Sequence, residues 1–112
     1  MKLDPRLHHY CQNITKGYLK DIVEMYELLN FKVVYTPPTN DWIMVGQEQL
    51  RFAIQITQVD SQPIEDIEIK KRTHIAFLSD DPQKAIDLIE NWAKTKNIKF
   101  RQGGWSSIER YF

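Results

Sequence analysis

The sequence predicts an α+β fold built from two tandem copies of one module, because the chain contains a faint internal repeat. Two strand-like runs begin with a histidine, at His9 and at His74, and a segment with apolar residues at helical spacing follows each of them. Two short segments of similar sequence, residues 30–33 and 97–100, follow the two helical segments. A repeat of this kind indicates the architecture before any single element is considered.

The first half of the repeat, residues 7–59, begins with an alternating run typical of a strand. Residues 7–14 place His9, Cys11 and Asn13 on one face of that strand and the residues between them on the other. A helix is expected next, because apolar residues recur along one stripe at helical spacing. That stripe consists of Leu19, Ile22, Val23, Tyr26 and Leu29.

Cap and turn residues mark the limits of this helix and of the strands that follow it. Thr15 is the expected N-terminal cap, and Asn30 is the expected terminator. Three strands are then expected, at residues 31–36, 42–45 and 50–59, separated by runs rich in proline, asparagine, aspartate and glycine. The first half is therefore predicted to follow the order strand, helix, strand, strand, strand.

A polar, charge-rich segment, residues 60–72, is expected to connect the two halves. The second half, residues 73–112, starts again with a strand at 74–78. A helix follows, and Asp81 before Pro82 marks its start with a side-chain acceptor and a preset φ angle. The apolar stripe of this helix consists of Ala85, Ile86, Ile89, Trp92 and Ala93.

The second half has one strand fewer than the first. Strands are expected at residues 98–102 and 108–112, on either side of a Gly103-Gly104 turn. No run in this half corresponds to the closing strand at 50–59. The second module is therefore predicted to lack its last strand, and an open edge of this kind favours pairing with another molecule.

Bulk properties narrow the class of protein to one soluble globular domain of 112 residues. Lys+Arg and Asp+Glu are both 15, so there is no electrostatic case for nucleic acid or an anionic membrane as partner. The sequence contains no apolar run long enough to span a membrane and no signal-peptide core near its start. Cys11 is the only cysteine, which favours a reducing, cytoplasmic location.

The order of these elements resembles the vicinal oxygen chelate superfamily, which includes glyoxalase I, extradiol dioxygenases and bleomycin-binding proteins. The resemblance rests on the histidine-headed strand at 9–14, the helix exit at 25–33, the strand at 51–56 and the second histidine-headed strand at 73–77. It covers nearly the whole chain from Leu7 onward. The resemblance implies that two βαβββ modules curl into an open, barrel-like mixed sheet with the helices outside.

The resemblance also implies a divalent metal held by the opening and closing strands of the modules. Carried over by position, the ligands are His9, Gln55 and His74. The fourth ligand, usually a glutamate, falls on the strand that this sequence lacks. Imidazole and amide donors with open positions suit Ni²⁺, Zn²⁺, Mn²⁺ or Fe²⁺, and such a metal would act as a Lewis acid on adjacent substrate oxygens.

Four residues are candidates for contact with a small-molecule substrate. Cys11 shares a strand face with His9, although a lone cysteine is also a common small core residue. Arg51 can hold an anionic group, or it can simply be solvated. Trp42 and Trp105 follow turns, where an aromatic side chain either lines the mouth of a pocket or covers the sheet.

These observations leave three classes of function open. The first is a metal-dependent lyase or isomerase of the glyoxalase I type, or a dioxygenase-like enzyme. The second is a metal-free, small-molecule-binding protein similar to bleomycin-resistance proteins, which the weakly ligating amide of Gln55 and the missing fourth ligand favour. The third is a structural module that serves only for pairing. A small-molecule ligand and a second copy of the chain are the expected partners.

Overall fold

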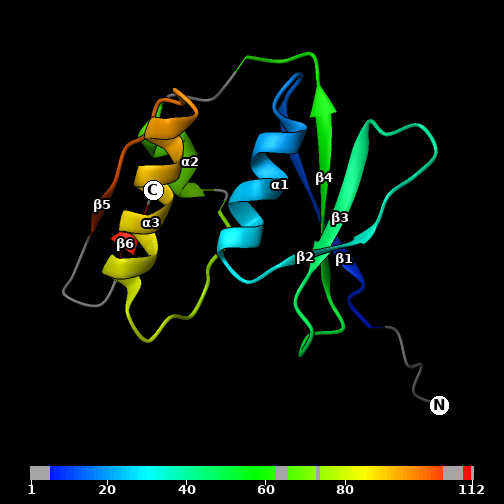
Figure 1. Cartoon of the computed structure of the whole chain (residues 1–112), viewed down its shortest axis with the longest axis horizontal. Helices are drawn as coiled ribbons and strands as arrows, with labels where there is room; N and C mark the ends of the chain where they lie inside the picture. The colour runs from blue at the N-terminus through cyan, green and yellow to red at the C-terminus, as the bar shows by residue number, and fades with distance from the viewer. Residues whose placement is uncertain (1–5, 63–65, 73, 105–109, 112) are drawn as a thin grey trace. The chain divides into compact units, whose positions relative to one another are not determined.

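Four strands and one helix form the first of two units in the chain (Figure 1). The computed structural model describes residues 6–62, 66–72, 74–104 and 110–111. The first unit is Met1–Pro63 and the second is Ile64–Phe112. The division falls inside the predicted connector at 60–72, and each unit is described by itself.

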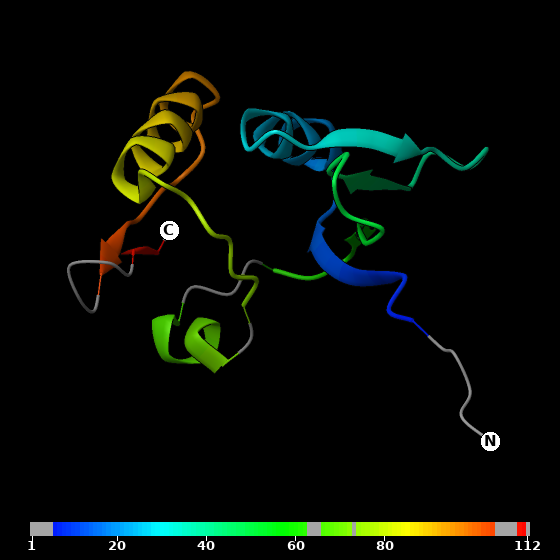
Figure 2. The ribbon, with the colours of Figure 1, turned by 90° about the horizontal axis from the view of Figure 1, so that it is seen from below.

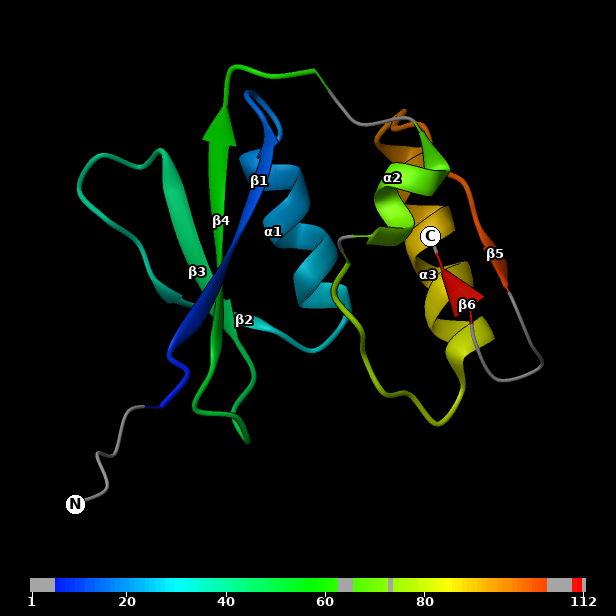
Figure 3. The ribbon, with the colours of Figure 1, turned by 180° about the vertical axis from the view of Figure 1, so that it is seen from behind.

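The first unit contains an open mixed sheet. Its elements are β1 (His9–Thr15), α1 (Leu19–Leu28), β2 (Lys32–Tyr35), β3 (Trp42–Gly46) and β4 (Ala53–Val59). The strands lie in the order β1-β4-β3-β2; β1 is parallel to β4, and the other two pairs are antiparallel. Figure 3 shows β1 beside β4. The α+β prediction is confirmed, and so is the order of elements expected in the first half.

The apolar stripe of α1 packs on one face of this sheet. Leu19, Val23 and Tyr26 are buried along the helix, and Ile54 and Ile56 are buried on β4. The helix contacts β2, β3 and β4. Figure 2, which looks nearly along β4, shows α1 on one side of the sheet and no helix of this unit on the other side. Burial of this stripe removes apolar surface from water and so stabilises the unit.

The two ends of α1 are fixed in different ways. The prediction that Thr15 caps the helix is wrong, because the backbone of Thr15 continues the β1–β4 pairing. Tyr18 stands at the cap position without a side-chain hydrogen bond, and the nearby Gly17 N–H donates to Gln58 Oε1 at 2.7 Å. At the other end Asn30 has a φ of 68°, a left-handed conformation that stops the helix as predicted.

The side chain of Tyr26 links α1 to the edge strand β1. Its hydroxyl donates a hydrogen bond to Gln12 Oε1 at 2.6 Å, and its ring meets the Phe31 ring edge-to-face at 5.2 Å between centroids. Only 2% of Tyr26 is exposed. Burial, with a smaller contribution from nearby Tyr10, raises the pKa of the Tyr26 hydroxyl to about 12.

This raised pKa predicts a loss of stability at high pH. The unfolded chain releases the phenolic proton near pH 10, and the folded chain holds it to about pH 12. The stabilisation is therefore complete below pH 10 and is lost as the pH rises toward 12, by roughly 2–3 kcal/mol. Urea unfolding followed at several pH values measures this slope. The Tyr26→Phe variant should show a shallower slope between pH 10 and 12; an unchanged slope would contradict the assignment.

The second unit contains two helices and one very short hairpin. Its elements are α2 (Ile67–Arg72), α3 (Pro82–Thr95), β5 (Gly103–Gly104) and β6 (Arg110–Tyr111), with β5 and β6 antiparallel. The predicted stripe of α3 is buried at Ile86, Ile89, Trp92 and Ala93. Beyond the helix, Asn97 has a φ of 55°, so an asparagine in the left-handed region follows both α1 and α3.

Three predictions for the second half are wrong within the described residues. Residues 74–78 and 98–102 form no strand, and the expected Gly103-Gly104 turn is a short strand instead. The connector at 60–72 contains the short helix α2. The reason for the missing strand at 74–78 lies in strand pairing. In the first unit β1 is paired with β4 alone, and the described part of the second half contains no strand equivalent to β4. Alternation in a sequence indicates a face, but it does not provide a partner.

The N-terminus of α3 is capped as predicted. The Asp81 side chain accepts a hydrogen bond from the Lys84 N–H at 3.0 Å, and Pro82 occupies the first helical position. The neighbouring Asp80 is exposed. This pair of adjacent aspartates therefore gives one capping residue and one matched control.

We expect Asp81→Ala to destabilise the second unit by about 1 kcal/mol, because the Lys84 N–H loses its acceptor. Thermal unfolding followed by the helical circular dichroism signal measures the effect. Asp80→Ala should change stability by less than about 0.5 kcal/mol. Equal effects of the two substitutions would show that the lost charge matters rather than the cap.

Candidate functional site

The face of the first sheet that lies opposite α1, called the open face below, carries most of the predicted site residues. The register pairs Cys11 with Gln55 and Asn13 with Thr57, so these side chains share one face. Met44 also lies opposite Gln55, on the other neighbouring strand. Alternate residues of β4 face α1 instead. His9, Cys11 and Asn13 therefore share one face of β1, as the sequence predicts.

A chain of neutral hydrogen-bonding groups crosses the open face. Gln55 Nε2 donates to Thr57 Oγ1 at 3.0 Å, and Thr57 Oγ1 lies 3.4 Å from Cys11 Sγ. Cys11 Sγ in turn lies 3.8 Å from Asn13 Oδ1. Cys11 is exposed, contrary to the interpretation as a buried core residue. These contacts hold the amide and thiol groups beside one another and leave Gln55 Oε1 as an acceptor.

The two adjacent histidines at the start of β1 contact each other. His8 Nδ1 and His9 Nδ1 are 2.9 Å apart, and the rings meet edge-to-face with centroids at 5.1 Å. One Nδ1 donates and the other accepts, so only one of the two Nδ1 atoms carries a proton. Both residues are exposed. His9 thus lies on the open face with its Nδ1 engaged by a neighbouring side chain.

The predicted metal ligands are divided between the two units. His9 and Gln55 lie on adjacent strands of the first unit, and Gln55 is opposite Cys11, two positions along from His9. His74 belongs to the second unit and is exposed. Within the described ranges, no group of three His, Cys, Asp or Glu side chains could hold a metal ion. The described residues therefore do not complete a metal site, and the metal stays a prediction.

A groove of about 640 Å³ lies on the open face of the first unit. At one end Tyr35 and Trp42 stack, with ring centroids 5.4 Å apart and planes tilted by 35°. Gly46 lies in the groove, where an added Cβ would come within 3.3 Å of the Val34 side chain. We call this cavity the open-face groove. It is lined by His8, Val34, Tyr35, Trp42, Met44, Gly46, Gln47, Leu50, Arg51, Phe52 and Ala53.

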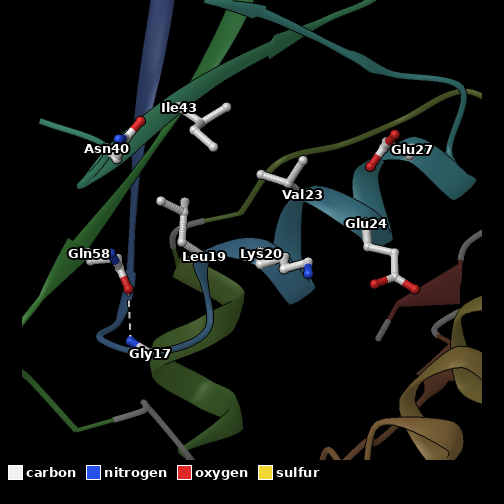
Figure 4. A pocket seen from close by; sticks show the side chains of 9 residues that line it. All are labelled: Gly17, Leu19, Lys20, Val23, Glu24, Glu27, Asn40, Ile43 and Gln58. Atoms are coloured by element: carbon white, nitrogen blue, oxygen red, sulfur yellow. Dashed lines mark hydrogen bonds between the residues drawn. The ribbon is translucent and has the colours of Figure 1, made fainter. Parts of the chain in front are cut away.

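A second groove of about 610 Å³ lies on the other side of the sheet, beside α1, and we call it the helix-side groove. Figure 4 shows Leu19, Val23 and Ile43 facing the same space, and the hydrogen bond between Gly17 and Gln58 at one end. The remaining lining residues are polar or charged: Lys20, Glu24, Glu27 and Asn40. Carboxylates and an ammonium group thus surround an apolar floor.

The four candidate substrate-binding residues lie in different places. Trp42 and Arg51 line the open-face groove. Cys11 lies on the same face, outside the lining of the groove. Trp105 lies outside the described residues. Sequence reasoning missed Tyr35 and the apolar residues near Arg51, although the alternation of β3, which places Trp42 and Met44 on one face, could have identified part of this surface.

Comparison of the chain with protein-family models, curated proteins and solved structures finds no significant match. The resemblance to the vicinal oxygen chelate superfamily therefore stays a prediction. None of the helices in the part of the chain that the structure describes is long and apolar enough to cross a membrane.

Proposed function

We propose that the first unit binds a small, planar molecule in the open-face groove, as a metal-free binding protein of the glyoxalase-like kind. The observation that carries this proposal is the aromatic pair of Tyr35 and Trp42 at the end of the groove. The volume of about 640 Å³ falls within the range of roughly 300–1,000 Å³ that small-molecule sites occupy.

The exposure of apolar side chains at this groove supports the proposal. Val34 is 53% exposed, Tyr35 50% and Leu50 55%, and all three line the same cavity. Exposed apolar groups that gather in a concave surface mark binding sites more often than single exposed residues do. A flat ring placed against Tyr35 and Trp42 would remove part of this surface from water and gain stacking contacts.

The topology of the first unit supports the finer fold prediction, which belongs to the same proposal. A strand, a helix and three strands, with the first strand parallel to the last, form one βαβββ module of the kind that the resemblance implies. We extend this to a curved, barrel-like sheet made of two modules, in which a second module or a second copy of the chain covers the open face. A homodimer and a cytoplasmic location remain part of the proposal.

A test of the proposed function uses the neutral probe 2-naphthamide. We expect it to bind the full chain and Trp42→Ala to weaken its binding roughly tenfold, because half of the stacking surface is removed. Isothermal titration calorimetry measures both dissociation constants. Tyr18→Ala is the control, because Tyr18 is 46% exposed in the same unit and lines neither groove. Equal losses in both variants would argue against the groove as the binding site.

A metal-dependent lyase or isomerase is the second candidate. One observation favours it: β1 and β4 place His9 and Gln55 on the same face, as the resemblance implies for two of the ligands. This candidate also needs His74 and a fourth ligand. The proposal that the site holds a divalent metal can be tested without knowing the reaction.

If this second candidate is correct, Zn²⁺ or Ni²⁺ should bind the purified full chain with a stoichiometry of one, as measured by calorimetry. Removal of one ligand weakens such a site by a factor on the order of ten or more. His9→Ala and His74→Ala should therefore each weaken binding strongly. His8→Ala should have little effect, which distinguishes the predicted ligand set from simple chelation by the His8–His9 pair. Absence of binding by the native chain would exclude this candidate.

A further inference from the structure

The open-face groove differs from the helix-side groove in the charge of its lining. Among the described residues that line the open-face groove, Arg51 is the one Lys or Arg, and there is no Asp or Glu. The helix-side groove, in contrast, has Lys20 together with Glu24 and Glu27. The whole chain has equal numbers of acidic and basic residues, 15 of each. The positive lining is therefore a local property of the open-face groove.

The guanidinium group of Arg51 has no ion pair and no hydrogen bond within the described residues, and the residue is exposed. Glu48, the nearest acidic residue along the chain, lies in the turn just before Arg51 but neither pairs with Arg51 nor lines the groove. Arginine presents its N–H groups as a planar fork that fits the two oxygens of a carboxylate. The groove thus offers an unused bidentate donor within the cavity that holds the aromatic pair.

His8 also lines the groove. When His8 Nδ1 accepts the hydrogen bond from His9 Nδ1, the proton of the His8 ring resides on Nε2. In that tautomer the Nε2–H is a donor that can stabilise a bound anion in addition to Arg51.

We infer that the open-face groove binds a planar aromatic carboxylate, with its ring against Tyr35 and Trp42 and its carboxylate at Arg51. This inference rests on the proposed function, because it assumes that the groove is a ligand site and names the chemistry of the ligand. Charge complementarity disfavours a cationic ligand in this groove and favours an anion over a neutral molecule of the same shape.

The test compares two probes of nearly the same shape, the anion 2-naphthoate and the neutral 2-naphthamide. We expect the native full chain to bind 2-naphthoate about tenfold more tightly, since a hydrogen bond to a charged group contributes more than one to a neutral amide. Arg51→Gln should remove this preference, because it should weaken the binding of 2-naphthoate much more than that of 2-naphthamide. Arg51→Lys should retain part of the preference, because the charge remains and the fork is lost. Arg101→Gln, at an exposed arginine of the second unit, should leave both affinities unchanged.

The outcomes separate the inference from the function on which it rests. Equal binding of the two probes, or a preference that survives Arg51→Gln, overturns the inference and leaves the proposed function intact. If neither probe binds the native chain, the proposed function and the inference both fail. A measurement on the native protein alone gives an independent check: the preference for 2-naphthoate should decrease as the salt concentration rises, because Arg51 is exposed to screening ions. A preference that is independent of salt contradicts the role of Arg51.

Discussion

The parallel pairing of β1 with β4 is the constraint on which the rest of the first unit depends. Its register runs without interruption from His9 with Ala53 to Thr15 with Val59. This pairing sets which side chains of both strands face α1 and which lie on the open face, since a shift by one residue would exchange the two sets. The burial of Ile54 and Ile56 against the helix and the hydrogen-bonded groups of the open face both depend on this one register.

Most of the first unit could be predicted from the sequence, because its signals are local. The apolar stripe around Val23 and Tyr26 indicates a helix, and the left-handed Asn30 ends it. The second half shows the limit of such reasoning. Residues 74–78 have the alternation of a strand and form none in the described part of the chain. A strand in the position of β1 requires a partner far along the sequence, and no local pattern contains that information.

The candidate site was predictable to a smaller extent than the fold. Alternation places Cys11 and Gln55 on one face, and the structure agrees. The groove depends instead on which turns approach which strands. Tyr35 meets Trp42 because β2 and β3 are neighbours, and Arg51 reaches the same cavity from the turn before β4. The mutual arrangement of residues from three segments is a property of tertiary structure, which spacing along the chain does not express.

The position of β4 at the end of the first unit also determines when β1 can gain its neighbour. β1 comes first in the unit, yet its partner in the described sheet is the last strand of the unit. The segments that form the intervening helix and hairpin must therefore be synthesised before β1 and β4 can pair, and the entropy of closing this long loop opposes that pairing. During synthesis β1 has no partner in this sheet until β4 has been made.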